Sequence, residues 1–137
     1  MQNGAYNMTY RSLTLRTLIL ASLLTLSAEA TIARDAAVYQ AAEFAAAQQQ
    51  EKHVIIEVFK KGCPTCAAQQ PALEKARQQF PDAVFMIVDF QHDTDAVNQF
   101  KVVKQSTILV FKGGTEVARL VGETDQTAIL AAIAKGA

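Results

Sequence analysis

The chain has 137 residues, of which 50% are hydrophobic and 19% are charged. This length and composition predict one compact domain and exclude a largely disordered chain. The 13 lysine and arginine residues balance the 13 aspartate and glutamate residues, so the net charge gives no reason to expect nucleic acid or an anionic membrane surface as a partner.

Residues 1–30 have the pattern of a secretory signal peptide. Arg11 and Arg16 precede the short apolar stretch 18–26, and Ala28-Glu29-Ala30 follows it as an A-x-A cleavage site. The apolar stretch is shorter than the roughly 20 apolar residues that span a bilayer. We therefore expect cleavage after Ala30, no membrane span in the mature chain, and a periplasmic or otherwise exported domain over residues 31–137. An uncleaved anchor that holds the domain at the outer face of a membrane is the alternative.

The first half of this domain predicts a helix and then a strand. Asp35 can cap an alanine-rich helix over residues 36–47, in which the apolar residues recur at helical spacing. Residues 53–59 form a short, β-branched and almost continuously apolar run, which is typical of a strand buried on both faces of a sheet.

A second helix and a second strand follow. Pro64 suits the start of a helix, where its missing N–H costs nothing, and the helix is predicted to run to Phe80 with Pro71 inside it. Residues 83–89 form another buried strand. Strand, helix and strand then make a parallel unit with a right-handed crossover, and the start of the helix lies at the carboxyl edge of the sheet, where α/β proteins place their sites.

The last third of the chain predicts a short helix, a β-hairpin and a final helix. The short helix covers residues 94–101. Gly113-Gly114 joins two strands, residues 107–112 and 115–120, as a hairpin turn. The final helix runs over residues 125–134, with apolar residues at core-facing spacing.

Cys63 and Cys66 are the two cysteines of the sequence, and they lie at the predicted start of the second helix. A disulfide that closes so small a loop constrains the unfolded chain very little, so redox chemistry explains the pair better than a structural role does. The positive end of the helix dipole stabilises a thiolate at the first position. We expect Cys63 to attack a substrate disulfide and Cys66 to resolve the resulting mixed disulfide.

The resolving thiol must lose a proton, and Glu57 is the candidate acceptor because it interrupts an otherwise apolar strand. A buried carboxyl there would have a raised pKa. The alternative is a solvated Glu57 that points out of the sheet. Lys60 and Lys61 could stabilise the Cys63 thiolate, although a lysine pair in a loop is more often simply solvated.

These residues together resemble the thioredoxin superfamily, over roughly residues 35–135. Glu57 stands six residues before Cys63, where the family usually has a buried aspartate. Pro71 falls at the position of the family's helix-kinking proline, five residues after the second cysteine, and Gly122 at the glycine beside the active site. Phe111-Lys112-Gly113-Gly114 resembles the family's hairpin turn.

The resemblance implies an α/β fold of three layers, in which helices flank a mixed sheet made of the parallel unit and the C-terminal hairpin. It also implies thiol-disulfide exchange without a cofactor, with Glu57 as a proton shuttle. Substrate contacts are expected from six positions around the dithiol: Gly62, Pro64, Thr65, Ser106, Thr107 and Gly122.

The sequence departs from the family pattern at three places. Gly62 replaces the tryptophan before the first cysteine, and Pro64-Thr65 replaces the Gly-Pro pair between the cysteines. Gln105-Ser106-Thr107 occupies the place of a cis-proline followed by threonine. A cis bond before a residue other than proline costs roughly 2.5 to 4 kcal/mol, so we expect a trans Gln105–Ser106 peptide.

The leading hypothesis is a monomeric thiol-disulfide oxidoreductase with protein disulfide or thiol substrates and an upstream redox partner protein, its direction of electron flow left open. A second is a metal-binding or metal-delivery module that uses the two thiolates for Cu(I) or Zn(II). His53 and His92 are not expected beside the dithiol, so no metal ligands are assigned. A third hypothesis, an interaction domain with a vestigial cysteine pair, is disfavoured by the intact dithiol.

Overall fold

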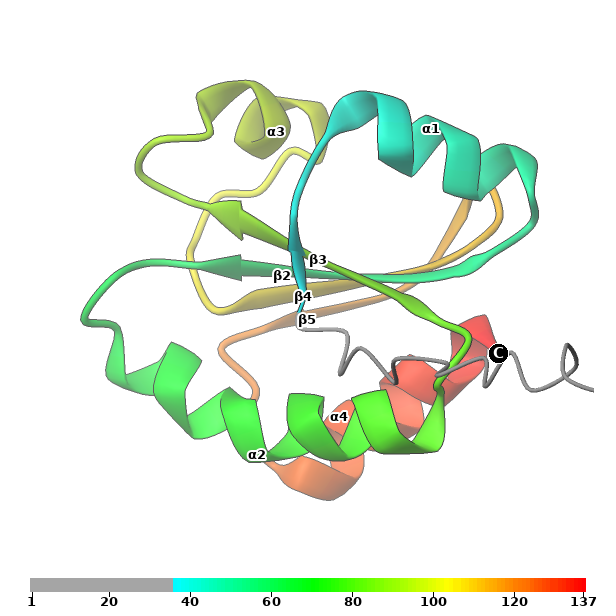
Figure 1. The fold of residues 1–137 in the computed structure, drawn as a ribbon. Coiled ribbons are helices and arrows are strands. Elements are labelled where there is room, and N and C mark those ends of the chain that lie inside the picture. Colours follow the sequence, from blue (N-terminus) through cyan, green and yellow to red (C-terminus); the bar gives the residue numbers. More distant parts are fainter. Residues whose placement is uncertain (1–35) are drawn as a thin grey trace, which may run out of the picture. The chain divides into compact units, whose positions relative to one another are not determined.

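The computed structural model describes residues 36–137, which form a sheet with helices on both faces (Figure 1). The strands lie in the order β1-β3-β2-β4-β5. In chain order the elements are β1 (Ala37–Val38), α1 (Ala41–Gln49), β2 (His53–Phe59), α2 (Pro64–Gln79), β3 (Val84–Asp89), α3 (Thr94–Gln99), β4 (Thr107–Lys112), β5 (Thr115–Val121), α4 (Gln126–Ile133) and the short 3-10 helix η1 (Ala134–Gly136).

The central strand β2 carries the functional end of the molecule. It pairs in parallel with β3, as the strand-helix-strand unit predicted, and antiparallel with β4, the first strand of the predicted hairpin. The five residues from Val54 to Val58 are buried: Val54, Ile56 and Val58 belong to the core on one face of the sheet, and Ile55 belongs to the core on the other. The predicted mixed α/β fold of three layers is therefore confirmed.

The predicted first helix is wrong at its start. Residues 37 and 38 form the edge strand β1, paired with Met86 and Ile87 of β3, and α1 begins at Ala41. The amide of Tyr39 also donates to the Ile87 carbonyl at 2.8 Å. Helix propensity is a weak preference, and here the open edge of β3 outweighs it. The proposed cap Asp35 lies outside the described residues.

A separate hydrophobic core lies on each face of the sheet. The core under α1 and α3 is rich in aromatic rings, with Tyr39, Phe44, Phe100 and Phe111 in contact at centroid distances of 5.1 to 5.9 Å. Helices α2 and α4 lie on the other face of the sheet (Figure 1). The core beneath them is mostly aliphatic. Packing on this second face fixes α2 against the sheet, and it thereby fixes the start of that helix.

The remaining elements follow the predictions closely. Asp93 and Asp125 cap α3 and α4 by accepting from the amides of Ala96 and Ala128. Ile129 and Ile133 of α4 are fully buried. None of the helices between residues 36 and 137 has the length and apolar character needed to cross a membrane.

Candidate active site

Cys63 and Cys66 lie at the start of α2, just after the connection from β2. Cys63 is the N-cap of the helix, and its sulfur accepts a hydrogen bond from the Cys66 amide at 3.1 Å. Pro64 occupies the first helical turn, as predicted. The two sulfurs form a disulfide, with the α-carbons 5.3 Å apart. An amide and the positive end of a helix thus both face the first sulfur, which favours negative charge on it.

The two cysteines differ in access. Cys66 is buried, with 5% of its surface exposed, whereas Cys63 is partly exposed and lies between the exposed residues Gly62 and Pro64. Both border an open cavity of about 470 Å³, together with Lys60 and other residues of the β2–α2 connection. A substrate sulfur can therefore reach Cys63 more easily than Cys66.

Glu57 lines this cavity and is buried rather than solvated. It is 5% exposed, and the side-chain amide of Gln70, in α2, donates to its carboxyl oxygen. Burial raises the pKa of Glu57, while the Gln70 hydrogen bond and the positive charge of Arg77 partly oppose the rise. Since Glu57 and Cys66 line the same cavity, a buried carboxyl with a raised pKa lies on the cysteine's side of the sheet.

The loop before β4 faces the dithiol with Ser106. The Ser106 hydroxyl oxygen lies 3.2 Å from the Cys63 sulfur and 3.3 Å from the Cys66 sulfur. The peptide bonds of the described residues, Gln105–Ser106 included, are trans, as expected, and Ser106 has a positive φ of 59°. The Gly122 amide donates to the Ser106 carbonyl at 2.8 Å. Gly122 and Ser106 are thus brought together beside the sulfurs.

The six positions expected to contact substrate are not equally accessible. Gly62 and Pro64 are exposed, and Thr65 and Gly122 are partly exposed. Ser106 and Thr107 are buried, with 2% and 1% exposed. The Thr107 hydroxyl donates to the Lys104 carbonyl, a hydrogen bond within the loop before β4. These two buried positions therefore offer almost no surface to a substrate in this structure.

Sequence reasoning missed two glutamines of α2 that organise the site. Gln69 is fully buried, and its side-chain amide donates to the carbonyls of Ser106 and Glu123 at 3.1 and 2.8 Å. Gln70 holds Glu57. A signal for Gln69 existed, because it lies one turn after Cys66 on the stripe that continues with the buried Leu73 and marks the face of α2 turned toward the sheet.

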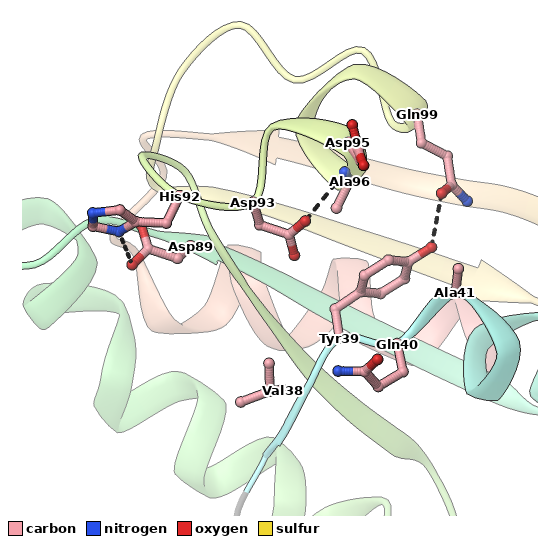
Figure 2. Close-up of a pocket in the computed structure, with 10 residues that line it drawn as sticks. All are labelled: Val38, Tyr39, Gln40, Ala41, Asp89, His92, Asp93, Asp95, Ala96 and Gln99. Carbon is pink, nitrogen blue, oxygen red and sulfur yellow. Dashed lines mark hydrogen bonds and ion pairs between the residues drawn. The ribbon is translucent and has the colours of Figure 1, made fainter.

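A second hollow, of about 480 Å³, lies between β1, α3 and the end of β3 (Figure 2). Several of its polar groups bond to one another or to the backbone. Tyr39 donates to Gln99, Asp89 pairs with His92, and Asp93 caps α3. Within residues 36–137, no three His, Cys, Asp or Glu side chains gather as metal ligands.

Neither histidine lines the dithiol cavity. His53 packs against Phe80 at the opposite end of β2, and His92 is in the loop after β3. The ligand supply that the metal-module hypothesis needs is therefore not found beside the sulfurs.

A central strand that leads into a helix capped by the first of two cysteines defines a thiol-disulfide oxidoreductase of the thioredoxin fold. The family model described as Thioredoxin matches residues 35–135, and the chain belongs to that family. Thioredoxin-1 of Saccharomyces cerevisiae is 36% identical over 97 residues, which cover 71% of this chain and 93% of the yeast protein. Thioredoxin of Mycoplasma genitalium is 31% identical over 80 residues, or 58% and 78% of the two chains.

Solved structures agree with this assignment. Trxlp from Edwardsiella tarda EIB202 superposes with a TM-score of 0.66 at 32% identity, covering 71% of this chain and 96% of that one. The oxidised thioredoxin from Plasmodium falciparum, at 24% identity and a TM-score of 0.62, covers 74% and 97% and supports the fold. The protein is a disulfide oxidoreductase that acts on disulfides of other proteins.

Proposed function

We propose that this protein is an exported, monomeric thioredoxin that exchanges disulfides with proteins outside the cytosol. An upstream redox partner protein then returns its cysteine pair to the starting redox state. The observation that carries the proposal is the asymmetry of the dithiol. Cys63 is the accessible sulfur and receives an amide hydrogen bond at the helix start, whereas Cys66 is buried one turn behind it. This arrangement supports Cys63 as the attacking thiolate and Cys66 as the resolving thiol.

In the first step, the Cys63 thiolate attacks one sulfur of a substrate disulfide. A bond forms between Cys63 and that sulfur, and the other substrate sulfur leaves with the electron pair of the broken bond and takes up a proton. In the second step, Cys66 gives its proton to Glu57 and attacks the Cys63 sulfur. The bond between Cys63 and the substrate sulfur breaks, and that substrate sulfur leaves with the electron pair as a thiolate. Two electrons have passed to the substrate, and the Cys63–Cys66 disulfide remains.

The burial of Glu57 supports its role as proton acceptor. A carboxyl with a raised pKa is a better match to a thiol than an ordinary carboxylate, since proton transfer is most efficient between groups of similar pKa. The Gln70 side chain fixes the position of the carboxyl and, in the cavity shared with Cys66, leaves its second oxygen available.

Activity and roles are tested by reduction of insulin disulfides with dithiothreitol. We expect the parent domain to accelerate the reaction and Cys63→Ala to abolish the acceleration. Cys66→Ala is the matched variant, because it keeps the attacking sulfur but cannot resolve. Reduced and then freed of dithiothreitol, it should accumulate a covalent mixed disulfide with substrate, which Cys63→Ala should not form. A Cys63→Ala variant as active as the parent would overturn the assignment, and gel filtration of the parent tests the monomer.

The proposed export rests on the signal pattern of residues 1–30, with Arg16 before the apolar stretch and Ala28-Glu29-Ala30 after it. Expression of the full chain in a bacterium with a periplasm, followed by osmotic release and N-terminal sequencing, tests it. We expect released protein that begins at Thr31. Released protein that retains residues 1–30, or activity confined to the cytosol, would contradict the proposed processing and location.

A further inference from the structure

The Ser106 hydroxyl lies between the two sulfurs of the dithiol. Its oxygen is 3.2 Å from the Cys63 sulfur and 3.3 Å from the Cys66 sulfur, and the residue is 2% exposed. We propose that Ser106 is a catalytic residue whose hydroxyl donates a hydrogen bond to whichever cysteine sulfur carries the negative charge during exchange. The inference deepens the proposed function, since it rests on the two-step roles of Cys63 and Cys66.

The position of this hydroxyl is enforced by the surrounding structure. Ser106 has a φ of 59°, in the left-handed region that side chains disfavour. The Gly122 amide and the Gln69 side chain both donate to the Ser106 carbonyl, at 2.8 and 3.1 Å. The Thr107 hydroxyl closes the same loop on Lys104. A strained residue that several hydrogen bonds hold in place is the arrangement expected of a functional contact.

The chemistry of the two redox states gives this contact a direction. A serine hydroxyl has one donor hydrogen and two acceptor lone pairs. A disulfide sulfur is a weak acceptor, whereas a thiolate is charged and attracts a donor much more strongly. The hydrogen bond therefore strengthens when the protein is reduced. Ser106 should favour the reduced dithiol, hold Cys63 as a thiolate at lower pH, and make the disulfide easier to reduce.

One hydroxyl can serve both half-reactions because it is nearly equidistant from the sulfurs. In the forward reaction the Cys63 thiolate carries the charge before attack. When a donor thiolate reduces the protein, the donor sulfur bonds to Cys63, and Cys66 leaves with the electron pair of the disulfide. The charge then lies on Cys66, whose sulfur is 3.3 Å from the same oxygen. The proton stays on Ser106 in both steps, so the residue stabilises charge without being consumed.

Two variants test the role of the hydroxyl separately from that of the backbone. Ser106→Ala removes the hydroxyl and keeps the β-carbon. Ser106→Gly also removes the hydroxyl, and glycine adopts a positive φ without strain. We expect both to lower the equilibrium constant for reduction by glutathione about tenfold, equivalent to about 30 mV in reduction potential. The pH midpoint of Cys63 thiolate formation, followed by ultraviolet absorbance, should rise by about one pH unit in both.

The pattern across the two variants decides the outcome. Equal shifts in Ser106→Ala and Ser106→Gly support the proposal. Values equal to the parent in both, or a shift in one variant but not in the other, overturn it, because the effect would then be absent or would come from the backbone. The glutathione equilibrium does not depend on which cysteine attacks first. A failure here is therefore distinct from a Cys63→Ala variant that still reduces insulin, which would overturn the proposed roles instead.

Discussion

Gln69 offers a sharp test of how the fold supports the site. Its side-chain amide donates to the carbonyls of Ser106 and Glu123, whereas its side-chain oxygen is buried without a hydrogen-bond partner. Gln69→Met keeps the length of the side chain and removes both polar atoms. Two lost hydrogen bonds should cost about 1 kcal/mol each, and removal of an unpaired buried oxygen should recover about 1 to 3 kcal/mol. The free energy of unfolding should therefore change by no more than about 1 kcal/mol.

The redox equilibrium of Gln69→Met should change even though stability hardly does. Without the Gln69 amide, the Ser106 carbonyl keeps only the Gly122 amide among the hydrogen bonds described for it, so Ser106 is held less firmly in its left-handed conformation. We expect part of the Ser106→Ala effect, a several-fold lower equilibrium constant for reduction by glutathione. Urea unfolding of the oxidised protein measures the stability. Equilibration of the protein with reduced and oxidised glutathione, followed by quenching, measures the redox equilibrium.

A double-mutant cycle shows whether Gln69 acts through Ser106. In the Ser106→Ala background, Gln69→Met should produce no further change in the glutathione equilibrium, because the hydroxyl that Gln69 positions is already gone. An undiminished effect in that background would refute the reasoning. A loss of several kcal/mol in stability with an unchanged redox equilibrium would refute it too, since Gln69 would then be a packing residue only.

Three further predictions concern charge, packing and the hairpin. Since burial raises the pKa of Glu57, its contribution to stability is complete below the unfolded-state pKa and is lost as the pH rises through the folded-state pKa. Glu57→Gln should therefore be more stable than the parent to urea at neutral pH but not in acid, and equal midpoints at both pH values would contradict this. Leu73→Ala, at a fully buried position, should lose about 2 to 5 kcal/mol in the same assay. Gly113→Ala should lose about 1 to 2 kcal/mol because φ is 52° and a β-carbon would lie 2.9 Å from a Glu51 oxygen, whereas Gly114→Ala, with open space around it, should lose much less.

The sequence pattern predicted those helices and strands whose boundaries are set by their own residues. The β-branched run of β2, Pro64 at the start of α2, and the glycines of the hairpin each carry their own structural preference. The prediction failed at β1, where the outcome depends on the distant edge of β3. An alanine-rich run is compatible with a helix, and nothing within it shows that residues 37 and 38 will find Met86 and Ile87.

In the site, too, the features set by local sequence could be predicted, and those set by distant contacts could not. The spacing of Cys63 and Cys66 is local, and the sequence was enough to identify both. The direction of Glu57 was left open because a strand buried on both faces shows no alternation of polar and apolar residues. The contact of Ser106 with the sulfurs could not be predicted from spacing, because 40 positions separate it from Cys66 and only the packing of the β4 loop against α2 brings the two together.

Backbone conformation around the dithiol supports the role given to Ser106. Three residues with positive φ gather there: Gly62 at 74°, Gly122 at 70° and Ser106 at 59°. Gly62 directly precedes Cys63, and the Gly122 amide donates to the Ser106 carbonyl. The two glycines adopt this conformation without steric cost, and a glycine at position 106 would do the same. Serine has the steric cost of a positive φ, and it adds a hydroxyl in contact with both sulfurs. The hydroxyl, rather than the backbone, therefore distinguishes this position from the other two.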